Sequence, residues 1–364
     1  MPHILVSLIS DQSIPNLLFL KEMPEQDRYI FITTAQMEKK RRSENLIKVA
    51  GLPTHKVEKI EVSSESLIDV LEKLDALRLS HFDDFIVHLT GGNKIMALAA
   101  HQFFVNRKST MYYAPIGKNG FEKIHPLDGD SGLKKFSQTV SLIDYLTVYG
   151  VDIKNPEDIN KTSQKKSVTE SMYNSGWASD LLFKNLTDYK SHYEKEHRGK
   201  SPTSIKISDI CGLDEALQKH WFITSHPEFL NQKEILYLAG GWFEEYIYLK
   251  LKEHFNLDSD KIGINVSVQK QGAARNECDV MVILNNDLYV VECKSRLTKI
   301  MFDQTAYKLT AIKKDFGLQA RSYLFASEDY RDISGNLHDN AEKRAKHLDL
   351  HIRDRKEIDN GNLI

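Results

Sequence analysis

The stretch Asn276–Lys294, NECDVMVILNNDLYVVECK, decides the fold of the C-terminal part of this 364-residue chain. Two apolar runs, Val280–Leu284 and Leu288–Val291, lie on either side of Asn285-Asn286. Asparagine tolerates the positive φ that a two-residue hairpin turn requires, so this pattern predicts a β-hairpin.

The predicted hairpin brings three charged side chains together at the ends of otherwise apolar strands. A two-residue turn places Asp279 directly opposite Glu292, and Lys294 shares a face with Glu292 because strand side chains alternate. Two neighbouring buried carboxylates cost free energy unless a cation or a shared proton compensates. The pattern therefore predicts a Mg²⁺ or Mn²⁺ site held by Asp279 and Glu292. Lys294 is expected to orient a water nucleophile or to stabilise charge on a phosphate. The alternative is an edge hairpin with solvated terminal charges.

The N-terminal part alternates between apolar strands and helices. Strands are expected over residues 3–9, 28–32, 57–62, 85–89 and 110–114, and helices over 17–21, 36–50, 66–77 and 95–105. The fourth strand is almost wholly apolar, as in a parallel sheet covered on both faces. This order predicts a doubly wound, Rossmann-like α/β domain.

Three polar loops follow strands of that predicted sheet. They are Ser10-Asp11-Gln12, Thr33-Thr34 and Thr90-Gly91-Gly92-Asn93-Lys94. Ligands of such sheets bind beyond the carboxyl ends of the strands, and a helix N-terminus offers free amides to anions. The loops predict a nucleotide-like ligand. The alternative is that Gly91-Gly92 forms only a tight turn and Asn93 only a helix cap.

Other cations in the chain allow two interpretations. The run Lys39–Arg42 fits either a phosphate contact or, with more weight, a solvated helix face. Arg296, Lys299 and Lys308 follow the hairpin and fit a nucleic-acid backbone or an exposed helix equally well.

A long helix is expected over residues 233–251 because apolar residues recur on one face. Glu244 and Glu245 interrupt its aromatic neighbourhood, and both being solvated is the simpler interpretation. After it, the expected order is three strands, a helix over 301–316, a strand over 321–326, a helix and a short strand. Residues 150–230 contain no recognisable catalytic or ligand-binding motif. This stretch suggests helical packing, a hinge or a lid.

The composition sets limits on location and partners. The net charge of −2 excludes a protein that coats nucleic acid over its whole surface, so any such contact is local. No run approaches the ~18 apolar residues that a membrane span needs. The N-terminus begins as a strand without a basic segment, and Cys211, Cys278 and Cys293 form no disulfide pattern. We expect a cytoplasmic protein without a signal peptide.

Both halves resemble known families. Asp279 with Glu292-Cys293-Lys294 resembles the Asp…(Asp/Glu)-x-Lys motif of restriction-endonuclease-like nucleases, and Glu244 is similar to the helix-borne glutamate of such families. Thr90-Gly91-Gly92-Asn93-Lys94-x-Met96 resembles the ligand loop of CRISPR-associated Rossmann-fold (CARF) sensors.

The joint resemblance implies a sensor over residues 1–148, a helical connection over 149–230 and a nuclease over 231–364. It implies a homodimer that binds a cyclic oligoadenylate, commonly the tetra-adenylate, through the three polar loops. It also implies phosphodiester hydrolysis by Glu244, Asp279, Glu292 and Lys294, with the three acids as metal ligands. The choice of DNA or RNA stays open. A non-hydrolytic sensor platform and an enzyme that degrades its own cyclic ligand are the alternatives.

Overall fold

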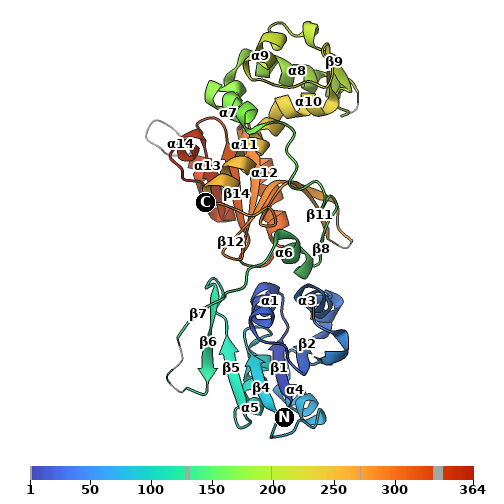
Figure 1. The fold of residues 1–364 in the computed structure, drawn as a ribbon, viewed down its shortest axis with the longest axis vertical. Coiled ribbons are helices and arrows are strands. Elements are labelled where there is room, and N and C mark those ends of the chain that lie inside the picture. Colours follow the sequence, from blue (N-terminus) through green and yellow to red (C-terminus); the bar gives the residue numbers. More distant parts are fainter. Residues whose placement is uncertain (1, 128, 130–131, 198, 271, 331–338) are drawn as a thin grey trace.

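The computed structural model describes the chain except residues 1, 128, 130–131, 198, 271 and 331–338. Three units follow one another along the long axis of the molecule (Figure 1). The N-terminal α/β unit lies at one end, the C-terminal α/β unit in the middle, and a helical unit at the other end.

The N-terminal unit is built on a seven-stranded sheet of order β3-β2-β1-β4-β5-β6-β7. The strands from β3 to β5 in this order run parallel, whereas β6 pairs antiparallel with β5 and β7 pairs antiparallel with β6. This confirms the predicted doubly wound fold. Its elements are β1 (His3–Leu8), α1 (Ser13–Glu22), β2 (Arg28–Thr33), α2 (Ala35–Lys39), α3 (Arg42–Ala50), β3 (Val57–Glu61), α4 (Leu67–Ala76), β4 (Asp84–His88), α5 (Lys94–Phe104), β5 (Ser109–Tyr113), β6 (Gly120–His125) and β7 (Lys134–Lys135), with a 3-10 turn Thr54–Lys56.

Helices cover both faces of this sheet, which is why the central strands are apolar throughout. Residues of α1 and α3 join one buried cluster with Leu5 and Phe31, and α4 and α5 join another with Val6 and Val87. The helix expected over 36–50 is two helices, because Arg41 adopts a left-handed conformation (φ 55°) between them. Gly51 (φ 66°) closes α3 in the left-handed conformation that glycine adopts at many helix C-termini.

The helical unit packs on the C-terminal unit through a shared core. It contains α7 (Lys166–Ser175), α8 (Leu181–Glu196), β9 (Ser204–Lys206), α9 (Leu213–Lys219) and β10 (Phe229–Asn231), with 3-10 turns Trp177–Ser179 and Ile207–Asp209. Buried Trp177 joins the same cluster as Trp242, and its Nε1 donates to the Leu238 carbonyl at 3.1 Å. The helical packing expected for this region is therefore present.

The C-terminal unit is a six-stranded sheet of order β15-β14-β13-β12-β11-β8. Its elements are α10 (Gln232–Leu236), a π-helical turn (Tyr237–Gly241), α11 (Trp242–His254), β11 (Ile262–Lys270), β12 (Asn276–Leu284), β13 (Asp287–Lys294), α12 (Lys299–Lys313), β14 (Arg321–Ala326), α13 (Asp339–Leu348), β15 (Leu350–Arg353) and α14 (Arg355–Asp359). The expected order of helix, three strands, helix, strand, helix and strand is confirmed.

Two details of this unit differ from the sequence expectation. The helix expected over 233–251 is interrupted at the π-helical turn, where Gly240 leaves helical geometry. The sheet also gains a sixth strand from the preceding connection, because β8 (Val151–Ile153) pairs antiparallel with β11. Three residues are too short a run for a periodicity argument to identify.

The two α/β units meet through α6 (Leu142–Val148) and the tip of the β12–β13 hairpin. The buried Asn286 side chain accepts from the Val140 amide at 2.9 Å and donates to Asn119 Oδ1 at 2.9 Å and the Gln138 carbonyl at 3.2 Å. One buried cluster includes both Leu5 and Leu324, so the units share a core. None of the helices in the described parts of the chain has the length and hydropathy to cross a bilayer.

Candidate active site and ligand loops

The predicted hairpin exists and brings the two carboxylates together. Asn285 (φ 51°) and Asn286 (φ 66°) form the two-residue turn that Leu284 and Asp287 close. The register pairs Val280 with Val291, and one further step sets Asp279 opposite Glu292.

Both carboxylates are held in place by the hairpin and its neighbours. Asp279 Oδ2 accepts a hydrogen bond from the Cys293 amide at 2.7 Å, which locks the side chain across the strand pair. Glu292 is only 2% exposed, and its Oε2 lies 3.3 Å from Lys294 Nζ. Lys294 Nζ also lies 3.7 Å from Asp279 Oδ2. The three predicted residues therefore form one charged cluster.

A second lysine completes this cluster. Lys308 of α12 donates from Nζ to Glu292 Oε1, so both oxygens of the buried carboxylate face an ammonium group. The sequence suggested a backbone contact or an exposed helix charge for Lys308, and the structure shows an intramolecular ion pair. Arg296 lies 4.0 Å from Glu328, away from this cluster.

Glu244 and Glu245 differ although they are adjacent. Burial, followed by the nearby charge of Asp279, raises the pKa of Glu244 to about 8, which places this carboxyl beside the cluster. Glu245 is 2% exposed, and its carboxylate accepts from the Ser163 and Gln164 amides at 3.0 and 3.1 Å. The interpretation that both glutamates are simply solvated is wrong, because Glu245 is buried and its hydrogen bonds hold the loop at Ser163 and Gln164 against α11.

Burial and charge coupling shift the other titratable groups here. Burial and then the Asp279 charge raise the pKa of Glu292 above its usual range. Burial alone would lower the pKa of Lys294, but the charges of Asp279 and Glu292 raise it. Burial also raises the pKa of the Cys278 thiol to about 12.

The cluster offers hard oxygen donors to a divalent cation. In the described parts of the chain, no three His, Cys, Asp or Glu side chains are arranged to ligate a metal ion. The adjacent carboxylates of Asp279 and Glu292 nevertheless fit Mg²⁺, which binds through one or two carboxylates and keeps several waters. The three-acid ligand set with Glu244 stays a prediction.

A cavity of about 550 Å³ opens beside this cluster. Glu244, Lys294 and Ser295 line it, and so do Lys161, Lys190 and Lys233. Lys161 and Lys190 come from the region in which the sequence shows no chemistry. No local signal identifies them, because only the fold brings them to a cleft formed by residues far along the chain.

The three predicted ligand loops lie along one edge of the N-terminal sheet. Strands β2, β1 and β4 are parallel neighbours, so their carboxyl ends adjoin. The sheet order changes direction between β1 and β4, the position where α/β folds bind ligands. Ser10 and Thr90 follow these two strands, whereas Thr33 and Thr34 lie at the end of β2.

The glycines are required by a close approach of two loops. A Cβ on Gly91 would lie 1.7 Å from the Leu8 carbonyl oxygen, so only glycine fits. Gly92 (φ 69°) is left-handed, and Asn93 caps α5 by accepting from the Met96 amide at 3.0 Å. The tight turn and the cap are thus both present, and the α5 N-terminus stays at the same edge.

The other loop side chains take part in internal contacts to different degrees. Thr33 donates to Glu38 at 2.8 Å, Thr34 caps α2, and Thr90 accepts from the Ala114 amide at 2.6 Å. Asp11 is held by Lys40 at 2.6 Å and Arg42 at 3.1 Å. Ser10 accepts from the Gln12 amide, Gln12 Oε1 accepts from the Leu318 amide of the C-terminal unit at 3.1 Å, and Lys94 is exposed. Of these loops, the Ser10–Gln12 loop is therefore hydrogen-bonded to the C-terminal unit as well.

Family comparisons agree with this division of the chain. The Card1 CARF domain family matches residues 4–145, and the Card1-like endonuclease domain family matches residues 231–360. No curated protein sequence matches the chain.

Solved structures share the whole fold. Protein VC1899 from Vibrio cholerae has a TM-score of 0.75 at 19% identity, covering 98% of this chain and 95% of its own. Can2 from Sulfobacillus thermosulfidooxidans, solved with cyclic tetra-adenylate, has a TM-score of 0.70 at 22% identity, covering 98% and 97%. A type III CRISPR defence DNA nuclease activated by cyclic oligoadenylate has a TM-score of 0.59 at 16% identity, covering 94% and 51%. These likenesses show that the arrangement of the units recurs.

Proposed function

Because the chain belongs to the Card1-like family, in which a CARF domain is joined to an endonuclease domain, we propose that it is a ligand-activated endonuclease of type III CRISPR defence. We propose that its activator is a cyclic oligoadenylate, specifically the cyclic tetra-adenylate. Its substrate is DNA, RNA or both. The observation that carries the proposal is the cluster of Asp279, Glu292 and Lys294 beside a cavity, in a chain that also carries the sensor loops.

The residues of the cluster have distinct roles in phosphodiester hydrolysis. Asp279 and Glu292 are the residues that would hold Mg²⁺ or Mn²⁺, which lowers the pKa of bound water and polarises the phosphate. Lys294 directs its ammonium group to the charge that develops on the phosphate oxygens. Glu244 lies in the cavity wall with Lys294, where its carboxylate would add a third oxygen ligand for the cation.

The sensor acts as a homodimer in this proposal. A cyclic oligoadenylate is a symmetric ring, and a two-fold dimer presents the same loops from both sides. On the face formed by α4 and α5, Ile68 is 66% exposed and Leu98 is 59% exposed, which gives a second copy an apolar surface to cover. Ligand binding then shifts the relative placement of two endonuclease domains.

The proposal is tested by cleavage of labelled single- and double-stranded DNA and RNA with Mg²⁺ or Mn²⁺. Each reaction is run with and without cyclic tetra-adenylate, beside Glu292→Ala. We expect ligand-dependent cutting that the variant loses. Cutting regardless of ligand would remove the switch and keep the nuclease, whereas ligand binding without any cutting would favour the sensor platform.

A further inference from the structure

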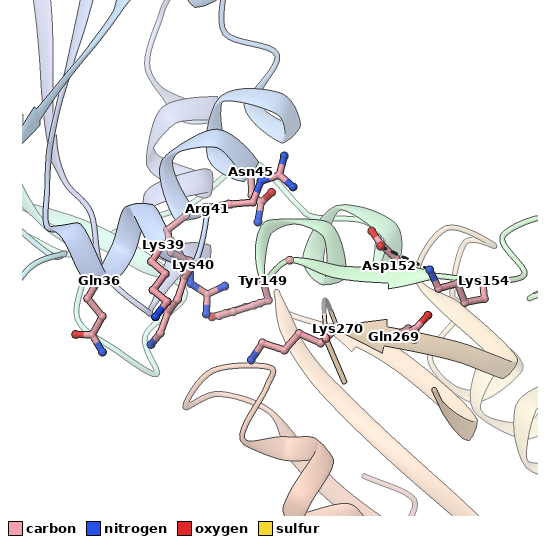
Figure 2. A pocket seen from close by; sticks show the side chains of 13 residues that line it. Gln36, Lys39, Lys40, Arg41, Asn45, Tyr149, Asp152, Lys154, Gln269 and Lys270 are labelled. Atoms are coloured by element: carbon pink, nitrogen blue, oxygen red, sulfur yellow. Dashed lines mark ion pairs between the residues drawn. The ribbon is translucent and has the colours of Figure 1, made fainter. Parts of the chain in front are cut away.

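A second large cavity lies between the N-terminal and C-terminal units, away from the Asp279–Glu292 cluster. Its volume is about 840 Å³, and one wall is the α2–α3 segment while the other is the β8–β11 edge (Figure 2). We call it the interdomain cleft. The cationic side chains that line it are Lys39, Lys40, Arg41, Arg42, Lys154 and Lys270.

Arg42 supplies a buried donor without an acceptor. The residue is 5% exposed, and its guanidinium carbon lies 5.3 Å from the centre of the Tyr149 ring. Its Nη2 and Nε bond Asp11 Oδ1 at 3.1 and 3.3 Å, but Nη1 has no hydrogen-bond partner among the described residues. Buried polar atoms are nearly always paired, so this nitrogen indicates a missing acceptor. Phosphate and carboxylate oxygens are the acceptors that a guanidinium group binds best, and a phosphate is the one that a nucleic-acid ligand supplies.

Lysines from both walls surround this position. Lys40 reaches Asp11 at 2.6 Å and Lys270 reaches Asp315 at 2.5 Å, while Lys39 forms no ion pair with any described residue. Figure 2 shows Lys39 and Lys40 extending from one wall and Lys270 from the other into the opening between them. Of the lining residues only Asp152 is acidic, and it lies 3.7 Å from Lys154. The carboxylates that pair with these cations are Asp11, Glu44, Asp152 and Asp315, so six cations exceed four carboxylates among the described residues and the interdomain cleft keeps a positive excess.

The lining favours recognition of phosphates over recognition of bases. Sequence-independent strand binding combines cations that follow the backbone with exposed aromatic rings for base stacking. The only aromatic side chain of the lining, Tyr149, is 2% exposed, so bases find no stacking surface there. Gln36, Asn45 and Gln269 add uncharged polar groups. This chemistry fits a phosphodiester backbone read without regard to sequence.

We infer that the interdomain cleft binds the phosphodiester backbone of a nucleic-acid strand and so holds the substrate at a distance from the cutting site. The inference rests on the proposed nuclease function and names where the substrate is held. It also explains how a protein with a net charge of −2 retains nucleic acid, because the contact is confined to one cleft. Asp11 would then exchange ion-pair partners with the strand, and Asp11 belongs to a predicted ligand loop.

The test measures strand binding by the full-length protein in which Glu292→Gln prevents cutting. Fluorescence anisotropy with labelled 20-nucleotide DNA and RNA strands is recorded over a salt series, with and without cyclic tetra-adenylate. The cleft variant adds Lys39→Gln and Lys270→Gln. The matched control adds Lys48→Gln, on the same helix as Arg42 but outside the lining, and Lys195→Gln on α8. Both variants lose the same charge.

We expect the cleft variant to bind at least about tenfold more weakly at low salt, while the control binds like its parent. Each lost phosphate contact lowers the slope of log affinity against log salt by roughly 0.7 for single strands, so two contacts remove roughly 1.4. Equal affinities and slopes for the cleft and control variants would overturn the inference, as would a parent that binds no strand at low salt. Failure of the nuclease proposal appears separately, as wild-type protein that binds a strand but never cuts it.

Discussion

At the scale of single residues, the central feature is a buried carboxylate that faces two ammonium groups. Glu292 is 2% exposed and contacts Lys294 and Lys308 from different elements. Removing one partner of a buried pair leaves an uncompensated charge, which costs more than the pair contributes. The two ammonium groups oppose the effect of burial and of the Asp279 charge, and they fix the Glu292 carboxyl where a cation-binding oxygen is needed.

We predict that Lys308→Met lowers the free energy of unfolding by about 1–2 kcal/mol at pH 8. The loss is smaller than for a fully buried pair because Lys308 is 37% exposed and water screens its charge. Urea unfolding of Lys308→Met, Glu292→Gln and the double variant measures the coupling. The double variant should be less destabilised than the two single losses summed, and strict additivity would contradict the ion pair.

Glu244 gives the folded state a pH dependence of definite sign. Its pKa rises from 4.5 to about 8 on folding, so between these values the folded chain keeps a proton that the unfolded chain releases. The free energy of unfolding therefore falls as pH rises, by up to about 1.4 kcal/mol per pH unit from this group. We predict that the free energy of unfolding of Glu244→Gln, taken relative to wild type, is about 1–3 kcal/mol higher at pH 8 than at pH 5.5. Chelator-containing urea titrations at both pH values measure it, and parallel pH curves for the two proteins would refute it.

At the scale of elements, the β4–α5 loop contains a position, Gly91, where close packing leaves no room for a side chain. Gly91→Ala sets a methyl group against the Leu8 carbonyl, at a spacing of 1.7 Å before relaxation. We predict a loss of about 2–4 kcal/mol in thermal or urea unfolding, above the ordinary range of overpacking because a backbone atom must move. Gly51→Ala is the control, since it meets no atom within 4 Å and carries only the strain of φ 66°. Gly91 does not have a positive φ, so a loss at Gly91 no larger than the loss at Gly51 would show that the contact with Leu8 relaxes at little cost.

Sequence patterns predict the elements whose cause is local. The hairpin turn follows from Asn285-Asn286, the α3 terminus from Gly51, and the parallel sheet from its alternation with helices. The break of α2 from α3 at Arg41 and the strand β8 depend on tertiary contacts, so no local pattern marks them. The same distinction applies to the candidate site. Strand alternation, a local pattern, predicts that Asp279, Glu292 and Lys294 lie together. The positions of Lys308, Lys190 and the interdomain cleft follow only from tertiary contacts.

At the scale of the whole molecule, Asn286 connects the hairpin tip to the N-terminal unit. Its side chain makes three hydrogen bonds across the junction and is 3% exposed, whereas Asn285 beside it is exposed. Both residues have positive φ, which glycine adopts without strain. Comparing substitutions of the two residues therefore distinguishes an effect on the turn from an effect on the junction between the units.

We predict that Asn286→Gly lowers the free energy of unfolding by about 2–3 kcal/mol and increases hydrogen exchange at residues 138–140, since the Val140 amide loses its acceptor. Asn285→Gly should change stability by less than about 0.5 kcal/mol, because it keeps the same turn and removes no contact at the junction. Calorimetry and hydrogen exchange on both variants provide the comparison. Equal behaviour of the two would mean that the junction does not depend on Asn286.

The pairing of β8 with β11 determines where the chain can be divided. Val151–Ile153 covers the outer edge of the C-terminal sheet, although it lies nearly eighty residues before α10 in the sequence. A catalytic fragment that began at Gln232 would leave the β11 edge with unpaired amides and carbonyls, which recruit strands from other molecules. Such a fragment is expected to aggregate on expression. A chimera that gives this endonuclease a new sensor must therefore keep the native chain from Val151 onward.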